Sequence, residues 1–191
     1  MSTTTDGLTN HSNLLRLEKY INSIEQQIFS LPIVKELKNE PSYIESRNYE
    51  NITEERLKYH FVGGTLGGKG KITVSPLMFF SEKKKESVTI LHVGDQMCGH
   101  NGIAHGGLLS TVMDELLART AIPCLPDKNG ATAYLHVNFR KPCKVDQILI
   151  GRCKTTKLER KKGYVEGTLE TLEGVIVVEA DALFISLKKL E

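Results

Sequence analysis

Apolar residues near the N-terminus recur every three or four positions, as they do on one face of an α-helix. They are Leu14, Leu17, Ile21, Ile24 and Ile28. The spacing predicts an amphipathic helix that begins at Asn13 and ends before Pro32, followed by a shorter helix at residues 33–38. We expect residues 1–12 to be disordered, and we assign residues 1–56 to an N-terminal extension of the domain.

The rest of the chain, residues 57–191, predicts one long helix among strands. The helix is the apolar segment 106–122, which Pro123 closes. Strands are expected at 72–80, 88–93, 131–140, 147–157, 164–171 and 175–187. No helices separate the last four strands, so they are expected to pair antiparallel, and the fold class is α+β.

Composition excludes several classes of function. The chain has 191 residues with 25 basic and 23 acidic side chains, and this net charge of +2 is too small to indicate nucleic-acid binding. No apolar run reaches the length of a membrane span. The N-terminus carries Asp6 and no arginine before Arg16, unlike most mitochondrial transit peptides. We expect an intracellular protein, with the cytosol and the mitochondrion both left open.

The four cysteines lie 26, 19 and 10 residues apart and form no Cys-x-x-Cys pair, so reduced thiols are expected. A zinc site built from Asp95, Cys98, His100 and His105 was considered as an alternative. Its spacing matches no common zinc pattern, and we expect no metal.

The stretch "GGTLGGK", ending at Lys69, has the glycine and lysine spacing of a phosphate-binding loop. Gly70 occupies the position where such a loop needs serine or threonine, however, and a strand-like segment follows it instead of a helix. The stretch is therefore interpreted as a turn or a lid.

The stretch "CGHNGIAHGGLLSTVMDE" is the strongest chemical signal. Gly106 and Gly107 begin the long helix, where unpaired backbone N–H groups and missing side chains suit an oxyanion hole. Asp114 shares a face with small residues and has no basic partner within its helix, which indicates a functional carboxylate. Glu115 is expected to form an ion pair with Arg119.

"HGGLLSTVMDE" and the later "TAYLHVNFRKP" resemble the hotdog-fold acyl-CoA thioesterases, in their phenylacetate-pathway and THEM4-like branch. The resemblance covers about residues 57–188. It implies a hotdog fold, in which an antiparallel sheet wraps one central helix. It also implies hydrolysis of a medium- to long-chain acyl-CoA in lipid metabolism, without a cofactor.

The resemblance also implies residue roles. Asp114 would be the general base or nucleophile, and Thr132 would hold the attacking water. Gly106 and Gly107 would supply the oxyanion N–H groups, with His105 shaping the turn before them.

The end of the substrate that carries CoA would bind Arg140 and Lys141. Many relatives have asparagine where this chain has Gly99, so we expect Asn101 to take over its role.

Hotdog relatives join their sheets across a two-fold axis, which implies a homodimer or a dimer of dimers. On this basis Asp114 of one subunit is expected to face Thr132 of its neighbour. Two other functions stay open: a catalytically silent acyl-CoA-binding or scaffold protein, and a dehydratase acting on 3-hydroxyacyl thioesters.

Overall fold

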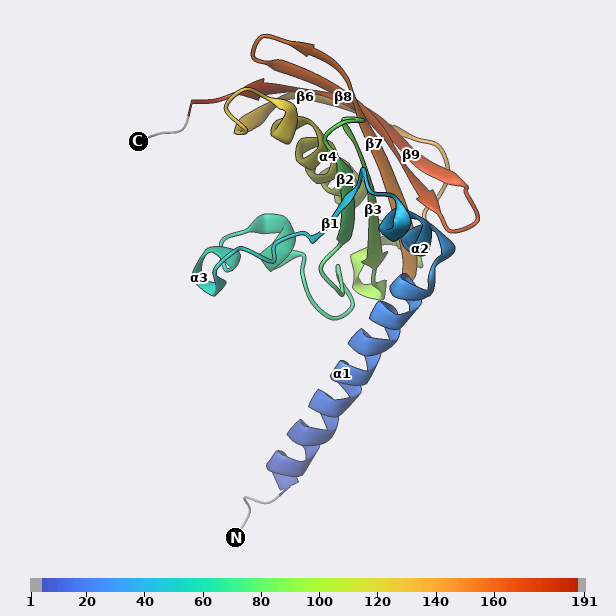
Figure 1. Cartoon of the computed structure of the whole chain (residues 1–191). Coiled ribbons are helices and arrows are strands. Elements are labelled where there is room, and N and C mark those ends of the chain that lie inside the picture. The colour runs from blue at the N-terminus through green and yellow to red at the C-terminus, as the bar shows by residue number, and fades with distance from the viewer. Residues whose placement is uncertain (1–4, 189–191) are drawn as a thin grey trace.

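The computed structural model describes residues 5–188. One long helix, α4 (Gly106–Ala121), is wrapped by a seven-stranded antiparallel sheet (Figure 1). In spatial order the strands are β1 (Ile44–Arg47), β2 (Leu77–Ser81), β3 (Glu86–Val93), β7 (Gln147–Glu159), β8 (Lys162–Thr171), β9 (Ile176–Ser186) and β6 (Gly130–Phe139). The predicted α+β class and hotdog arrangement are confirmed.

Burial of α4 explains the curvature of the sheet. Its buried apolar residues are Leu108, Leu109, Val112, Met113, Leu116, Leu117 and Ala121. Two glycines on the concave face let the strands approach these side chains. A Cβ atom on Gly151 would collide with Leu116, and one on Gly167 would lie 2.6 Å from the Cys153 sulfur. At these two positions the absence of a side chain therefore lets the sheet approach the core closely.

A second apolar layer covers part of the outer face of the sheet. It comes from α1 (Thr5–Ser30) and α2 (Pro32–Asn39), whose Ile24, Ile28 and Val34 are buried. They belong to a cluster with residues of β2, β3 and β7, namely Leu77, Phe79, Val88, Ile90, Ile148 and Ile150. The N-terminal extension is thus packed on the sheet and also supplies its edge strand β1.

Helix α1 begins at Thr5, before the predicted start at Asn13. Residues 1–4 lie outside the described part of the chain. No proline interrupts the segment, and extending an existing helix costs far less than starting one. The N-terminal half of α1 projects beyond the body (Figure 1), and Leu14 is 53% exposed there. Within residues 5–188, no helix is long and apolar enough to cross a lipid bilayer.

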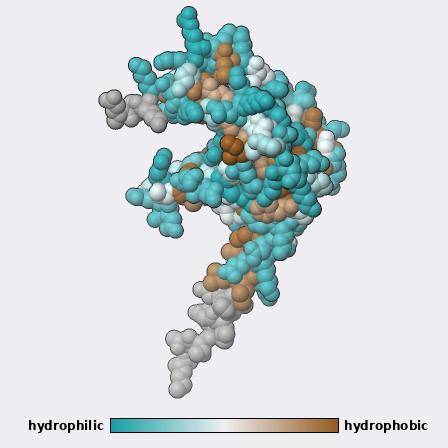
Figure 2. All heavy atoms as spheres, in the orientation of Figure 1, coloured by the Kyte–Doolittle hydropathy of each residue, from teal (hydrophilic) through white to brown (hydrophobic). Residues whose placement is uncertain are grey.

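Residues 48–70 form an arm that stands off from the body between β1 and β2 (Figures 1 and 2). It contains α3 (Glu54–Leu57) and a π-helix, Phe61–Thr65. The strand predicted at 72–80 begins only at Leu77, and before it Ile72 makes isolated bridges to Gly67 of the arm and to Val93. The glycine-rich stretch is therefore part of the arm and not a strand-loop-helix unit.

A buried histidine joins α1 to the sheet. His92 on β3 is 5% exposed, and its Nδ1 lies 3.1 Å from the Thr73 hydroxyl. Its Nε2 lies 3.4 Å from a carboxylate oxygen of Asp146, which also accepts a hydrogen bond from the Tyr20 hydroxyl of α1. Burial lowers the pKa of His92, and the charges of Asp146 and Asp95 oppose this only in part.

We predict that the protein loses stability as the pH falls below 6.5, the ordinary pKa of histidine. The unfolded chain then binds a proton at His92 more readily than the folded chain does, so the free energy of unfolding decreases until the lowered pKa is passed. Urea unfolding between pH 7 and pH 5 measures this slope. His92→Gln should flatten it, whereas His100→Gln, at an exposed position, should not.

Candidate active site

The start of α4 is held by the histidine that precedes it. His105 is the N-cap, and its Nδ1 accepts the backbone N–H of Gly107 at 2.9 Å. A Cβ atom on Gly107 would lie only 2.9 Å from that nitrogen, so glycine is needed there. Within the described residues, the N–H of Gly106 has no hydrogen-bond acceptor. Of the two predicted oxyanion donors, one is therefore already engaged and one is free.

Two hydroxyls fix the carbonyl groups of the same turn. Ser110 donates to the Gly106 carbonyl at 3.0 Å, and Thr111 donates to the Gly107 carbonyl at 2.9 Å. Side-chain hydrogen bonds thus engage the carbonyl groups of Gly106 and Gly107 as well as the N–H of Gly107. The sequence reasoning missed both hydroxyls, although their spacing of four residues from the glycines is the signal for such bonds.

A short hairpin positions His105. It consists of β4 (Cys98–His100) and β5 (Ile103–Ala104), and the His105 N–H donates to the Met97 carbonyl at 2.9 Å. A Cβ atom on Gly99 would lie 2.7 Å from the His105 ring, which explains glycine at this position. Asn101 is exposed in the hairpin turn, so its proposed role as a replacement stays a prediction.

Asp114 and Thr132 lie in direct contact within one chain. The Thr132 hydroxyl donates to Oδ1 of Asp114 at 2.9 Å. The prediction that Asp114 faces Thr132 of a neighbouring subunit is therefore wrong. The edge strand β6 packs along α4, and an irregularity between Thr132 and Tyr134 lies beside this contact. Asp114 is half-buried, and the strand beside it is exposed.

Glu115, the residue after Asp114, has its carboxylate engaged in an ion pair. Glu115 accepts a hydrogen bond from Arg119 at 2.7 Å, which confirms the predicted ion pair. The Arg119 guanidinium also lies 4.7 Å from the centre of the Tyr49 ring. Burial raises the pKa of Tyr49, with the Glu115 charge adding to the effect. Glu115 is thus part of a structural cluster with the base of the arm.

Two hollows flank the helix start. One, of about 420 Å³, is bounded by His105, Gly107 and Leu108 together with the arm. The other, of about 380 Å³, is bounded by Gly106, Phe139, Arg140 and Lys141 among others. Arg140 is paired with Glu179 of β9, at 2.7 Å from its Nε. Each glycine of the pair therefore faces a different hollow.

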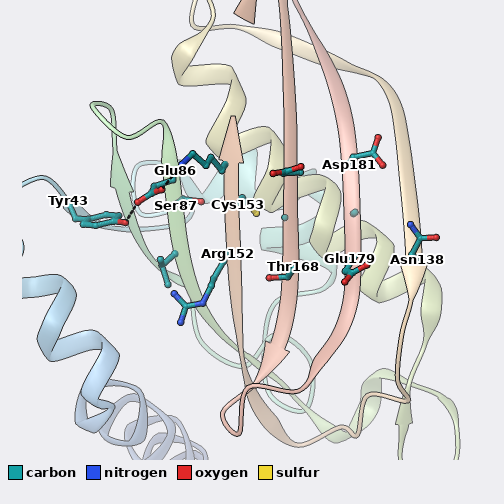
Figure 3. Close-up of a pocket in the computed structure, with 14 residues that line it drawn as sticks. Tyr43, Glu86, Ser87, Asn138, Arg152, Cys153, Thr168, Glu179 and Asp181 are labelled. Carbon is teal, nitrogen blue, oxygen red and sulfur yellow. Dashed lines mark hydrogen bonds and ion pairs between the residues drawn. The ribbon is translucent and has the colours of Figure 1, made fainter. Parts of the chain in front are cut away.

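A third hollow, of about 510 Å³, lies on the outer face of the sheet, with α4 behind the strands (Figure 3). Several of the charged side chains that line it form ion pairs or hydrogen bonds with side chains on neighbouring strands. Tyr43 donates to Glu86 at 2.5 Å, and Arg152 pairs with Glu170 at 2.6 Å. None of the predicted site residues lines it, so it is separate from the candidate active site.

The cysteines are free, and burial keeps two of them protonated. It raises the pKa of Cys143 to about 11 and that of Cys153 to about 12. Cys98 donates its thiol hydrogen to the Asp95 carbonyl. In the part of the chain that the structure describes, no three histidine, cysteine or acidic side chains are grouped as metal ligands.

Residues 101–178 match the sequence profile of the thioesterase superfamily. An uncharacterized protein of Schizosaccharomyces pombe is 31% identical over 170 residues, which make up 87% of this chain and 94% of that protein. An uncharacterized mitochondrial protein of Candida albicans is 30% identical over 151 residues, with 79% of this chain and 68% of that protein covered. Acyl-coenzyme A thioesterase THEM4 of Mus musculus is 29% identical over 111 residues, with 58% of this chain and 47% of that protein covered.

Among solved structures, a Streptococcus mutans protein bound to acetyl CoA is similar with a TM-score of 0.52 and 22% identity. The match covers 58% of this chain and 88% of that one, and it shows the fold. The strand order, the enclosed helix and the matches to known proteins thus indicate the same class of protein. The chain belongs to the thioesterase superfamily.

We predict that His105→Ala lowers the free energy of unfolding by about 1 kcal/mol, because the Gly107 N–H loses its capping acceptor. His105→Asn should recover most of this loss, since asparagine is a good N-cap. Chemical denaturation of the three proteins measures the difference. Equal destabilisation by alanine and asparagine would contradict the capping role and point to packing of the ring against Gly99.

Proposed function

We propose that this protein hydrolyses medium- to long-chain acyl-CoA thioesters to the free acid and CoA. The observation that carries the proposal is the carboxylate of Asp114, which is half-buried on α4 and hydrogen-bonded to the Thr132 hydroxyl. Within residues 5–188 it has no cationic partner. A half-buried carboxylate that no cation neutralises can accept a proton from water, which suits a general base. The likeness to the mouse thioesterase supports the same reaction class.

The chemistry needs few groups because a thioester is already a reactive acyl donor. The Thr132 hydroxyl holds Oδ1 of Asp114, which leaves Oδ2 to take a proton from water. The resulting hydroxide attacks the carbonyl carbon, and the oxyanion is stabilised by the free N–H of Gly106. Collapse of the intermediate breaks the C–S bond and releases CoA as a thiolate. The scheme requires no cofactor.

The distance between Gly106 and Asp114 supports a site that is shared by two chains. Gly106 and Asp114 are eight residues apart on one helix, which separates them by about 12 Å along its axis. An oxyanion donor and a base must both come within about 3 Å of the reacting groups. We therefore infer that Asp114 and Thr132 of one chain act on a thioester bound to Gly106 of another.

The edge strand β6 is the surface that suits a second copy. It pairs only with β9, so its other side presents unpaired backbone groups along ten residues. Phe139 on this strand is 55% exposed. Pairing of two β6 strands would cover the edge and bring the Asp114 side chains near the second chain. A homodimer, alone or as half of a dimer of dimers, is the assembly we propose.

The hollow beside Gly106 suits the CoA end of the substrate. Lys141 and Arg140 border it and can pair with phosphate groups, although Glu179 already neutralises part of the arginine charge. For the compartment, the name of the Candida albicans relative supports the mitochondrion over the cytosol.

We predict that Asp114→Asn lowers kcat at least about 100-fold, because it keeps the shape of the side chain and removes the base. Glu115→Gln is the matched control, since that side chain is bound to Arg119. It should retain activity and lose about 0.5 kcal/mol of stability. Release of free CoA, followed with a thiol reagent over a series of chain lengths, measures both. Tight binding of acyl-CoA without turnover by the unaltered protein would instead indicate a silent binding protein.

We predict that Gly106→Pro lowers kcat by about 100-fold or more, because proline removes the N–H that would stabilise the oxyanion. Proline is tolerated at the first position of a helix, and His105 before it is already extended. Gly106→Ala keeps the N–H and is the control for added bulk, so its loss of activity should be much smaller.

Mixing variants tests whether the site is shared. In a dimer of one Asp114→Asn chain and one Gly106→Pro chain, one site carries both defects and the other carries neither. Random exchange should therefore restore about a quarter of the normal activity. Asp114→Asn mixed with Thr132→Ala should restore none, because both residues serve the same site from one chain. Proven exchange with the opposite result would exclude this arrangement.

A further inference from the structure

The hollow beside Gly107 has a wall that comes from outside the family-matched region. The match to the superfamily covers residues 101–178, whereas Phe61 and Leu66 belong to the arm. Met97 and Leu108 add to the apolar part of the lining, and Gly107 is also a lining residue. The hollow is thus bounded both by the helix start and by an apolar surface that the arm supplies.

The arm is held firmly where it forms this wall. Val62 is buried, and Leu66 packs against the core cluster that contains Leu108. The π-helix is capped by His60, whose Nδ1 accepts the Gly63 N–H at 3.0 Å. Phe61 directly precedes Val62, is 58% exposed and lines the hollow. Together with Leu66, Met97 and Leu108 it forms a contiguous apolar lining, which is typical of a small-molecule site.

We propose, on the basis of the proposed thioesterase function, that Phe61 and Leu66 form the surface that receives the acyl chain and sets the preferred chain length. A straight acyl chain suits this lining better than a polar or charged acyl group. A volume of about 420 Å³ lies within the range of small-molecule sites. Each methylene that becomes buried against it should raise kcat/KM by about fourfold, until the hollow is full.

The test is the chain-length profile of kcat/KM, from acetyl-CoA to long-chain acyl-CoA, for the unaltered protein and for Phe61→Ala. We expect the preference for the best chain over acetyl to fall about tenfold in this variant, with little change for acetyl itself. Tyr59→Ala is the matched control, because Tyr59 lies on the same arm, is 86% exposed and does not line the hollow. Its profile should be unchanged.

Failure of this inference and failure of the proposed function give different results. If the unaltered protein hydrolyses no acyl-CoA, the proposed function is wrong. If it hydrolyses them and Phe61→Ala keeps the same profile, the arm does not set chain length. An equal change in Tyr59→Ala would also overturn the assignment, since it would assign the effect to the arm as a whole. Circular dichroism of both variants confirms that they are folded.

Discussion

The burial of one helix inside a curved sheet constrains the rest of this structure. Helix α4 is apolar around most of its circumference, so it is stable only when strands enclose it. The strands can close over it because Gly151 and Gly167 carry no side chain where Leu116 and Leu117 press against the sheet. A larger residue at either glycine would force the sheet away from the helix and open the core.

The same enclosure decides where chemistry can occur. The apolar faces of α4 are sealed, and Glu115 and Arg119 are paired with each other, so the polar groups that remain for chemistry lie at its N-terminus and on the side that faces the edge strand β6. The first provides the Gly106 N–H, and the second provides Asp114 with Thr132. The two groups are eight residues apart on one rigid helix, about 12 Å along its axis. Our proposal of a site shared by two chains rests on this separation.

The sequence predicted the elements that have a strongly periodic apolar pattern and the contacts between residues close in sequence. The α4 helix was expected at residues 106–122 and is found at Gly106–Ala121, and the Glu115–Arg119 pair follows from their spacing on its surface. The contact between Thr132 and Asp114 within one chain could not be predicted, because it depends on how β6 lies along α4. The link from His92 to Asp146 and Tyr20 also joins distant segments and leaves no periodic signal.

The N-terminal third shows why a match to a family describes only part of this protein. Residues 101–178 contain α4 and most of the sheet, but they cannot bury the outer face of β3 and β7. Helices α1 and α2 do so with Ile24, Ile28 and Val34, and the chain that continues from them forms β1 and the arm. The packed extension leads through β1 directly into the arm. This packing helps to position Phe61 relative to the start of α4. The hollow beside Gly107 is therefore lined both by the family-matched core and by the arm that precedes it in the chain.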